Sequence, residues 1–262
     1  MSKMKIASWN VNSIRVRLDH VKEWLQTVKP DVLVLQETKV QDHDFPVDDF
    51  SALGYQVCFI GQKSYNGVAI LYHKGLDPSD IATQMPDYKD EEKRFLAATF
   101  AGIHVVNVYV PNGRHIDHEA YQYKMEWLSH LHDYLKKQLA KHDRLVVLGD
   151  FNIAPKDIDV HDPQAWEGDV LVSPRERDAL EGLLDLGLHD SFRALNDKQQ
   201  LFSWWPYKGF AFRRQRGLRI DLALVSDALL SSCKGSDIDV TPRQWDRPSD
   251  HAPIFIDCHL DS

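Results

Sequence analysis

Polar residues that could do chemistry stand in this sequence where apolar, strand-like runs begin or stop. Asn10 closes the first such run, Glu37 follows the second, and His251 stands just before the last. The residues placed in this way are Asn10, Glu37, Tyr109, Asp150, Asn152, Asp221, Asp250 and His251. Because a sheet gathers the ends of its strands along one edge, we expect these side chains to meet in a concave site.

These side chains supply carboxylate and amide oxygens together with one imidazole, and no cysteine is among them. Hard oxygen donors suit Mg²⁺, with Mn²⁺ as a substitute, better than they suit zinc. Such a site favours the attack of an activated water on phosphorus, where catalysis consists mainly of positioning and charge stabilisation. The residue types therefore indicate a metal-dependent hydrolase of phosphate esters.

Each of these residues has an ordinary structural explanation when it is taken alone. Asn and Gly after a strand are turn formers, which would account for the segment 149–152. Glu37 belongs to a residue type that is usually exposed, and Asp221 could pair with a neighbouring arginine. We favour the functional interpretation because so many strand ends of one chain carry residues of this kind.

Apolar periodicity indicates the elements that would position these residues. The runs 4–9 and 31–36 predict buried strands. Between them, apolar residues recur at intervals of four and three from Ile14 to Val28, which predicts a helix that Pro30 ends. Further strands are predicted at 55–60, 67–73, 95–100, 103–110, 145–148, 218–225 and 253–258, and further helices at 121–139 and 174–186.

The order of these elements predicts the α/β class and a single domain over residues 1–262. We expect a four-layer sandwich in which two mixed, mostly antiparallel sheets pack together and helices flank them. Hydrophobic residues make up 43% of the chain and charged residues 27%, as in ordinary globular proteins. A chain of this length can bury enough apolar surface to fold without disulfides or a structural metal.

The three cysteines are Cys58, Cys233 and Cys258, and none of them forms a C-x-x-C motif. Their odd number and their spacing argue against a disulfide framework or a zinc knuckle and favour a reducing compartment. The sequence begins without an apolar signal segment and contains no run long enough to span a membrane. We therefore expect a cytoplasmic protein, a monomer, with no membrane partner.

The net charge of −8 is unusual for a protein that would bind DNA, but binding depends on where the charges lie. The segment 208–219 carries Lys208, Arg213, Arg214, Arg216 and Arg219 and no acidic residue. The acidic runs 42–49 and 87–92 lie elsewhere in the chain. The charge distribution therefore allows a directed basic surface for nucleic acid.

Ordered motifs along nearly the whole chain resemble one known family. These motifs are Trp9-Asn-Val-Asn-Ser-Ile-Arg15, Gln36-Glu-Thr-Lys39, Tyr65-Asn-Gly-Val-Ala-Ile70, Asn107-Val-Tyr-Val-Pro-Asn-Gly113, Gly149-Asp-Phe-Asn-Ile-Ala154, Ser203-Trp-Trp205, Arg216-Gly-Leu-Arg-Ile-Asp221 and Ser249-Asp-His-Ala-Pro253. Through them the chain closely resembles the exonuclease III family of class II abasic-site (AP) endonucleases. That family belongs to the endonuclease/exonuclease/phosphatase superfamily, so the resemblance implies a DNase I-like fold.

The resemblance also implies a role for most of the polar residues. Glu37 matches the principal metal-binding carboxylate, and Asp150 matches the residue that orients or deprotonates the attacking water. Asn152 matches a donor to the phosphoryl oxygens, and His251 matches the imidazole at the scissile phosphate. The metal site implied in this way consists of Asn10, Glu37, Asp150, Asn152, Asp250 and His251.

Three further positions complete the implied site. Asp221 matches the carboxylate that orients His251, and Tyr109 matches a phenol close to the phosphate. Asn12 departs from part of the family, because some relatives carry an aspartate ligand there while the bacterial exonuclease III branch has Asn. A neutral amide is a weaker ligand, so we leave Asn12 out of the metal site and the number of metal ions open.

The implied substrate is double-stranded DNA that contains abasic sites or blocked 3′ ends. Trp204 matches the aromatic residue of a pocket for a sugar without its base, with Trp205, Leu218 and Ile220 as walls. Tryptophans beside a strand are more often part of the core, and Trp205 could be either. The basic run 213–219 would hold backbone phosphates, which position DNA without reading its sequence. The residues predicted to contact the substrate are Asn112, Trp204, Arg216, Leu218 and Arg219.

The activity implied is hydrolysis of the phosphodiester bond 5′ to an abasic site, which leaves 3′-hydroxyl and 5′-deoxyribose phosphate ends. We expect 3′→5′ exonuclease and 3′-phosphatase or phosphodiesterase activities beside it. One alternative is a superfamily relative that acts on phosphoinositides or sphingomyelin, against which the segments 204–205 and 216–221 argue. A non-catalytic DNA-binding scaffold is the other alternative, and it predicts losses among catalytic residues that are all present.

Overall fold

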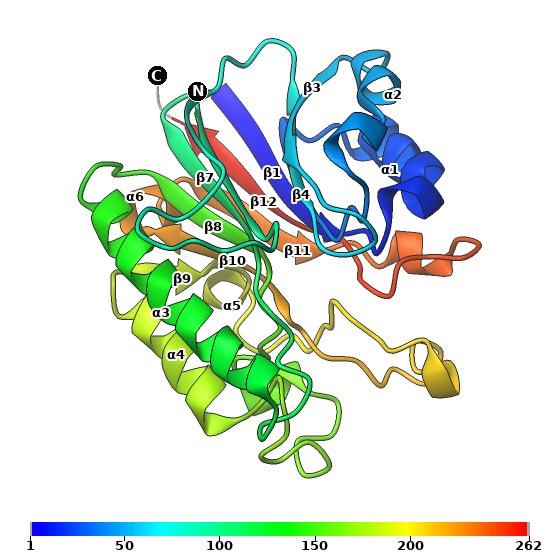
Figure 1. Cartoon of the computed structure of the whole chain (residues 1–262), viewed down its shortest axis with the longest axis vertical. Helices are drawn as coiled ribbons and strands as arrows, with labels where there is room; N and C mark the ends of the chain where they lie inside the picture. The colour runs from blue at the N-terminus through cyan, green and yellow to red at the C-terminus, as the bar shows by residue number, and fades with distance from the viewer. Residues whose placement is uncertain (1, 261–262) are drawn as a thin grey trace.

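Two six-stranded sheets lie face to face in the computed structural model, which describes residues 2–260 (Figure 1). Helices cover the outer face of each sheet, so the chain forms four layers. In the order of neighbouring strands, the first sheet reads β11-β12-β1-β2-β4-β3 and the second reads β5-β6-β7-β8-β10-β9. This arrangement confirms the predicted α/β sandwich with two packed sheets.

The strands and helices have the following bounds. The first sheet comprises β1 (Ser2–Asn10), β2 (Val32–Gln36), β3 (Tyr55–Ile60), β4 (Val68–His73), β11 (Cys233–Ile238) and β12 (Ile254–Leu260). The second sheet comprises β5 (Ser79–Ala82), β6 (Phe95–Phe100), β7 (Ile103–Tyr109), β8 (Leu145–Asp150), β9 (Leu188–Asp190) and β10 (Asp221–Ser226). The α-helices are α1 (Ile14–Val28), α2 (Val47–Ser51), α3 (Glu119–Leu139), α4 (Pro174–Leu184), α5 (Ser191–Leu195) and α6 (Asp227–Leu230). Short 3-10 turns are η1 (Asp42–Asp44), η2 (Asp157–Asp159), η3 (Lys208–Phe210) and η4 (Thr241–Gln244).

Each sheet contains one parallel strand pair among antiparallel neighbours. β1 runs parallel to β2, with Asn10 in register with Gln36. In the second sheet β7 runs parallel to β8, with Tyr109 in register with Asp150. Parallel strands end at the same edge, so each pair brings the residues at its carboxyl ends together.

Side chains that alternate along β1 and β2 face opposite sides of the first sheet. Ile6 and Val34 belong to the core between the sheets, where they join Leu148 of β8. Leu35 instead packs beneath α1 together with Trp24. Because these strands are covered on both faces, they read as continuous apolar runs in the sequence.

The three helices that the sequence predicts are present as α1, α3 and α4, and all three lie on outer faces of the sandwich (Figure 1). The helix α1 buries Ile14 and Val21 and ends where Lys29 adopts a left-handed conformation, directly before Pro30. The helix α3 buries Trp127 and covers the second sheet beside α4. Within residues 2–260, no helix has the length and apolar character needed to cross a membrane.

A buried polar contact joins the two sheets below the polar strand ends. The side-chain amide of Asn107, on β7, donates to the main-chain oxygens of Leu35 and Ala69 in the first sheet, at 3.0 and 2.9 Å. In return, the amide of Gln36 donates to Asn107 Oδ1 at 2.8 Å. A buried polar group that has all its partners costs little, whereas a shifted sheet would leave it unpaired. This contact therefore fixes how the sheets sit on each other.

The sequence did not predict β5, β9 or β11. These strands lie at the edges of the two sheets, where a strand has a neighbour on one side only. Most residues of β5 are exposed, and β9 has three residues. Little apolar burial means little apolar patterning, so the sequence signal for such strands is weak.

Candidate active site

The carboxyl ends of the two parallel strand pairs meet at one end of the sandwich. Asn10, the last residue of β1, donates from its amide to Glu37 Oε1 at 2.8 Å. The same amide donates to Asp150 Oδ2, at the end of β8 in the other sheet, at 2.9 Å. One buried side chain thereby joins a carboxylate from each sheet, which is the convergence that the sequence predicted.

Glu37, Asp150 and His251 form a cluster that could hold a metal ion, since one ligand atom from each lies within 4.8 Å of the others. Burial, together with the carboxylates of Asp221 and Glu37, raises the pKa of Asp150 to about 7. Several carboxylates that are buried together need positive charge nearby, because unpaired charges are costly away from water. Carboxylate oxygens are donors that Mg²⁺ and Mn²⁺ accept, so this cluster suits a divalent cation.

Lys39 stands beside the metal-binding candidate Glu37, and the sequence prediction missed it. Its ammonium lies 2.8 Å from Glu37 Oε2 and donates to Asn12 Oδ1 at 2.5 Å. Burial by itself raises the pKa of Glu37, but the charge of Lys39 and the hydrogen bond from Asn10 outweigh it and lower this pKa. Glu37 is therefore ionised at neutral pH, and an ionised carboxylate can act as a ligand of a cation.

Two residues of the site adopt left-handed backbone conformations that are uncommon for residues other than glycine. The φ angle is 53° at Glu37 and 50° at Asn152. Conformations of this kind cost of order 1–3 kcal/mol and persist where surrounding contacts impose them. The main-chain oxygen of Glu37 accepts from Ser13 N at 2.8 Å, and the main-chain N–H of Asn152 donates to Asp150 Oδ1 at 2.9 Å.

His251 is held between two carboxylates. Its Nδ1 lies 2.8 Å from Asp221 Oδ2, and its Nε2 lies 3.7 Å from Asp150 Oδ2. Burial by itself lowers the pKa of His251, but Asp221 and Asp150 outweigh it and raise this pKa to about 10. Asp221 is positioned at the start of β10, where its N–H donates to Ser203 Oγ at 2.9 Å. The imidazole is therefore a cation that offers a proton on Nε2 at neutral pH.

The amides of Asn112 and Asn152 contact each other beside Asp150. Asn112 Nδ2 donates to Asn152 Oδ1 at 2.9 Å, and Asn152 Nδ2 donates to the main-chain oxygen of Val110 at 3.0 Å. Beneath them lies Lys124 of α3, a second residue that the sequence prediction missed. The sequence did contain a sign of this residue, because Lys124 is a charged residue within the apolar stripe of α3, between Tyr121 and Leu128.

Tyr109 ends β7 with its ring against a buried arginine. The guanidinium of Arg94 lies 4.4 Å from the centroid of the ring, and its Nη1 donates to the main-chain oxygen of Tyr109 at 3.3 Å. Burial and the carboxylate of Glu37 raise the pKa of Tyr109 well above its usual range, although Arg94 opposes them. The phenol is therefore neutral and can only donate or accept a hydrogen bond.

Asp250 lies outside the cluster formed by Glu37, Asp150 and His251. Its Oδ1 accepts from Asn12 Nδ2 at 2.9 Å, and its Oδ2 accepts from Trp204 Nε1 at 3.0 Å. Asp250 thus connects Trp204 to the loop after β1, and its role as a metal ligand stays a prediction. The same holds for Asn10 and Asn152, whose side-chain oxygens accept from Asn12 N and from Asn112.

The structure corrects the role predicted for Leu218. This side chain is completely buried, in a cluster that includes Val160 and Ile220, and the half-buried Trp204 packs against that cluster. A side chain without exposed surface cannot contact a substrate, so the predicted contact of Leu218 is wrong for this structure. Trp205 belongs to the core between the sheets, at 1% exposure, and is not a pocket wall.

Arg219 is also misassigned as a substrate contact. Its side chain is buried, with Nε 2.7 Å from Asp159 Oδ1 and Nη2 2.6 Å from Asp190 Oδ2. A buried guanidinium needs paired carboxylates, and here both are present. Arg219 therefore joins the segment after η2 to β9 and cannot bind a phosphate.

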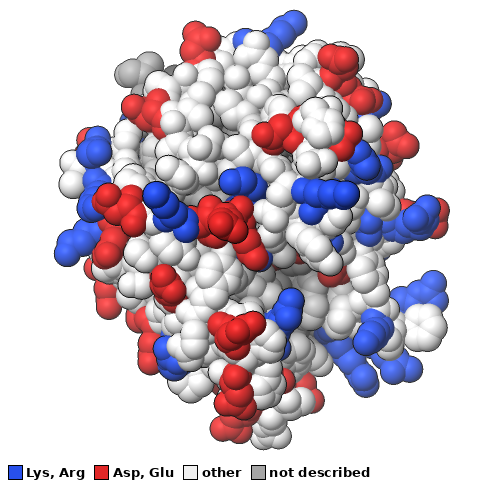
Figure 2. Space-filling model, in the orientation of Figure 1, with Lys and Arg blue, Asp and Glu red and all other residues white. Residues whose placement is uncertain are grey.

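The remaining basic residues of the segment 208–219 are exposed. These residues are Lys208, Arg213, Arg214 and Arg216, and the ring of Phe210 in the same segment is also exposed. Figure 2 shows the Lys and Arg side chains gathered on this segment, which protrudes at the lower right of Figure 1. This segment is distant in the sequence from the acidic residues Glu37 and Asp150. It forms a basic surface of the kind that the sequence analysis expected for nucleic acid.

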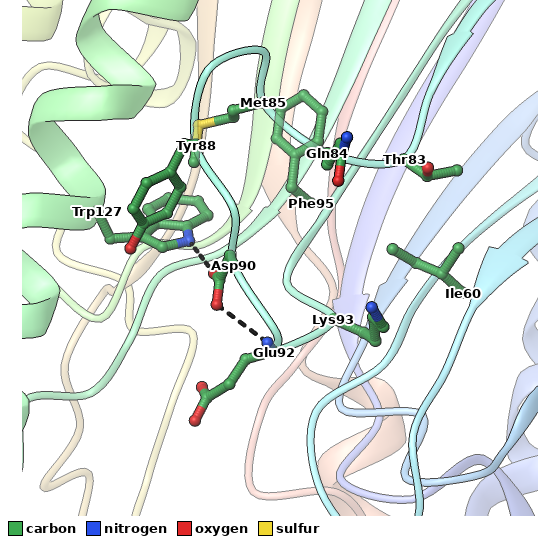
Figure 3. A pocket seen from close by; sticks show the side chains of 10 residues that line it. All are labelled: Ile60, Thr83, Gln84, Met85, Tyr88, Asp90, Glu92, Lys93, Phe95 and Trp127. Atoms are coloured by element: carbon green, nitrogen blue, oxygen red, sulfur yellow. Dashed lines mark hydrogen bonds between the residues drawn. The ribbon is translucent and has the colours of Figure 1, made fainter.

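A small cavity of about 80 Å³ lies elsewhere, between α3 and the segment 83–93 (Figure 3). Both of its acids already have partners: Asp90 accepts from Trp127 Nε1 at 3.0 Å and from the hydroxyl of Tyr123 at 2.9 Å, and Glu92 pairs with Arg94. None of the predicted site residues lines this cavity. We therefore place the functional site at the strand ends.

The chain is similar to known proteins over nearly its whole length. The sequence profile described as "Endonuclease/Exonuclease/phosphatase family" matches residues 7–251. The exodeoxyribonuclease III of Haemophilus influenzae is 37% identical, over 97% of this chain and 99% of its own length. A Neisseria 3′ phosphatase, NExo, solved with a product DNA hairpin, has a TM-score of 0.96 and 40% identity over 98% of this chain and 100% of its own. An AP endonuclease from Archaeoglobus fulgidus has a TM-score of 0.93 and 38% identity over the same shares.

Proposed function

This chain belongs to the endonuclease/exonuclease/phosphatase family as a DNA-repair nuclease, and we propose that its clustered strand ends hydrolyse the phosphodiester bond 5′ to an abasic site. The products would carry 3′-hydroxyl and 5′-deoxyribose phosphate ends. Blocked 3′ ends would be further substrates, through 3′→5′ exonuclease and 3′-phosphatase activities. The observation that carries the proposal is the hydrogen-bonded group that joins Asn10, Glu37 and Asp150 across the two sheets.

Glu37 and Asp150 are the residues that would hold a divalent cation, and Mg²⁺ is the ion that we propose. Bound there, the cation would polarise a phosphoryl oxygen and offset negative charge on the leaving 3′-oxygen. Glu37 is ionised because Lys39 and Asn10 stabilise its charge. His251 is protonated while it pairs with Asp221, so it serves better as a donor to phosphate than as a metal ligand.

Asp150 is proposed to orient the attacking water and to take its proton. A carboxylate fixed at this place can accept the proton of the water, and a positioned general base typically adds about 10²–10⁴-fold to the rate. The amides of Asn112 and Asn152 each donate one N–H within the site, and the second N–H of each could donate to phosphoryl oxygens. Loss of one such donor typically costs on the order of 10²–10³ in rate. Tyr109 would add a neutral phenol as a further donor to the phosphate.

DNA would lie across the basic segment that contains Lys208, Arg213, Arg214 and Arg216. Contacts of this kind bind backbone phosphates and release counterions, so binding weakens steeply as salt increases. Trp204 stands between this segment and His251 in the fold, since it forms β-bridges with Leu218 and His251. We propose that Trp204 contacts the sugar at the cleavage site.

The test is cleavage of an end-labelled duplex that carries a single abasic analogue, with products sized against time in Mg²⁺. We expect a cut 5′ to the lesion with the parent protein and almost none with Asp150→Asn or Glu37→Gln. Asp87→Asn is the matched control, because this carboxylate is 87% exposed and outside the site. An intact duplex with the parent protein, or full cleavage by Asp150→Asn, would overturn the proposal. Hydrolysis of a phosphoinositide instead of DNA would favour the other branch of the superfamily.

A further inference from the structure

Lys124 and Glu176 form an ion pair that is completely buried between α3 and α4. Both side chains have no exposed surface, and Lys124 Nζ contacts Glu176 Oε1. The two helices lie side by side on the outer face of the second sheet (Figure 1). Burial favours the neutral amine and lowers the pKa of Lys124, although Glu176 opposes this shift. Neither residue has a part in the chemistry described above.

The ammonium of Lys124 reaches the main chain of both active-site asparagines. It donates to the main-chain oxygen of Asn152 at 2.7 Å and to that of Asn112 at 3.2 Å. With Glu176, these contacts use all three N–H bonds of the ammonium group. The side chains of the two asparagines also contact each other, because Asn112 Nδ2 donates to Asn152 Oδ1 at 2.9 Å.

The aliphatic part of Lys124 also sets how closely the loop after β7 can approach. A Cβ atom at Gly113 would lie 3.2 Å from Lys124 Cδ and 3.3 Å from Tyr121, and the φ angle of Gly113 is 90°. A larger residue would therefore push the loop away from α3. The loop that carries Asn112 is seated directly on the lysine side chain.

Glu176 holds the other end of this arrangement. Its Oε1 accepts from Leu171 N at 3.0 Å, and its Oε2 accepts from Ser173 N at 3.0 Å. It also completes the N-terminal capping box of α4. Glu176 is thus fixed by the backbone around it, and it fixes the position of the ammonium in turn.

Stability alone is a poor reason to keep such a pair. Removing two charges from water is costly, and apolar residues of similar size often replace a buried ion pair without loss. What an apolar residue could not supply is a donor between two carbonyl groups on separate loops. We propose that Lys124 is a positioning residue, which holds the main chain of Asn112 and Asn152 so that both amides face the scissile phosphate. This inference rests on the proposed function, in which those amides bind phosphoryl oxygens.

The experiment is a double-mutant cycle on DNA cleavage with Lys124→Met and Asn152→Ala. Lys124→Met keeps an unbranched side chain that is shorter by the amine alone, and it removes every side-chain donor. We expect it to lower kcat about 10²-fold and to leave KM within about threefold, because misplacement of catalytic groups by about 1 Å has effects of this size. In the Asn152→Ala background, the effect of Lys124→Met on kcat should shrink, because only the part that acts through Asn112 remains and groups that act together are not additive. Tyr121→Phe is the matched control, because it removes the hydrogen bond to Ser173 in the same layer without touching either asparagine.

The outcomes separate this inference from the proposed function. A full loss of kcat from Lys124→Met in both backgrounds would overturn the inference, because the lysine would then act independently of Asn152. Unchanged kcat in Asn152→Ala alone would instead overturn the role proposed for that amide. If Lys124→Met does not fold, Lys124→Gln takes its place, as a neutral residue that keeps two donors. A loss of kcat that persists undiminished in its Asn152→Ala background would again overturn the inference.

Discussion

The pair formed by His251 and Asp221 allows a quantitative prediction. The substitution Asp221→Asn keeps the shape of the side chain and an oxygen that can accept from His251 Nδ1, but it removes the negative charge. The two charges are separated by about 4 Å, and at an effective dielectric constant of about 20 they attract each other by about 4 kcal/mol. One pKa unit corresponds to about 1.36 kcal/mol, so this charge accounts for about three units. We therefore expect the pKa of His251, raised to about 10 in the parent protein, to fall to about 7 in the variant.

The assay is NMR of the ¹⁵N-labelled imidazole of His251, titrated against pH in EDTA so that no divalent cation interferes. Asp257→Asn is the control, because that carboxylate pairs with Lys5 on β1 and makes no contact with His251. If the pKa of His251 in Asp221→Asn stays within about one unit of its value in the parent protein, the reasoning is refuted. That result would mean that Asp150, 3.7 Å from Nε2, holds the proton by itself.

The same shift predicts how activity and stability depend on pH. Near pH 8 most His251 in Asp221→Asn would be neutral, so the ratio of variant to parent kcat should rise as the pH falls from 8.5 to about 6.5. The pKa of His251 in the folded parent lies above its usual value of 6.5. Its contribution to stability is therefore complete below pH 6.5 and is lost as the pH rises through about 10. Urea unfolding in EDTA should show that the difference in stability between parent and variant becomes smaller as the pH rises from 6.5 to about 10.

Three further perturbations test other parts of the structure. Glu37→Gln should raise the Mg²⁺ concentration that gives half-maximal cleavage by at least about 10-fold, and an unchanged Mg²⁺ titration would contradict the assignment. Arg219→Met should lower the free energy of unfolding by about 3–5 kcal/mol in urea, because it leaves Asp159 with one partner fewer, whereas a loss of DNA affinity without a loss of stability would contradict the burial of Arg219. Gly149→Ala should also destabilise the fold, by about 3 kcal/mol, because its Cβ would lie 1.9 Å from the main-chain oxygen of Val108, and a variant as stable as the parent would contradict that clash.

Long, well-covered elements could be predicted from the sequence because burial and periodicity coincide in them. The strand β2 is buried at every position and reads as an unbroken apolar run, and α1 shows its buried stripe in the spacing of its apolar residues. The edge strands β5, β9 and β11 could not be predicted in this way. They are stabilised by main-chain pairing with one neighbour, which leaves little trace in side-chain type.

Residue types in the site could be predicted, and the resemblance gave Asp221 as the partner of His251, but most other contacts could not be predicted. An arginine in a basic run looks the same whether it faces solvent, as Arg216 does, or is buried between carboxylates, as Arg219 is. Cys233 and Cys258 also carry no sign in the sequence of lying side by side, yet strand pairing brings their sulfur atoms to 3.3 Å. Contacts of this kind depend on long-range pairing, which local sequence does not encode.

The sequence by itself determined the kind of chemistry, because strand ends rich in Asn, Asp, Glu and His have few other uses in one chain. The residues alone, without the family resemblance, could not determine which of those groups would share a proton, a hydrogen bond or a metal. Only the tertiary structure decided that Asn10 joins Glu37 to Asp150, that Asp250 turns toward Trp204, and that a buried lysine supports the active-site loops. The physical reason is that charge and hydrogen bonding act over a few ångströms, and the fold alone sets which groups come that close.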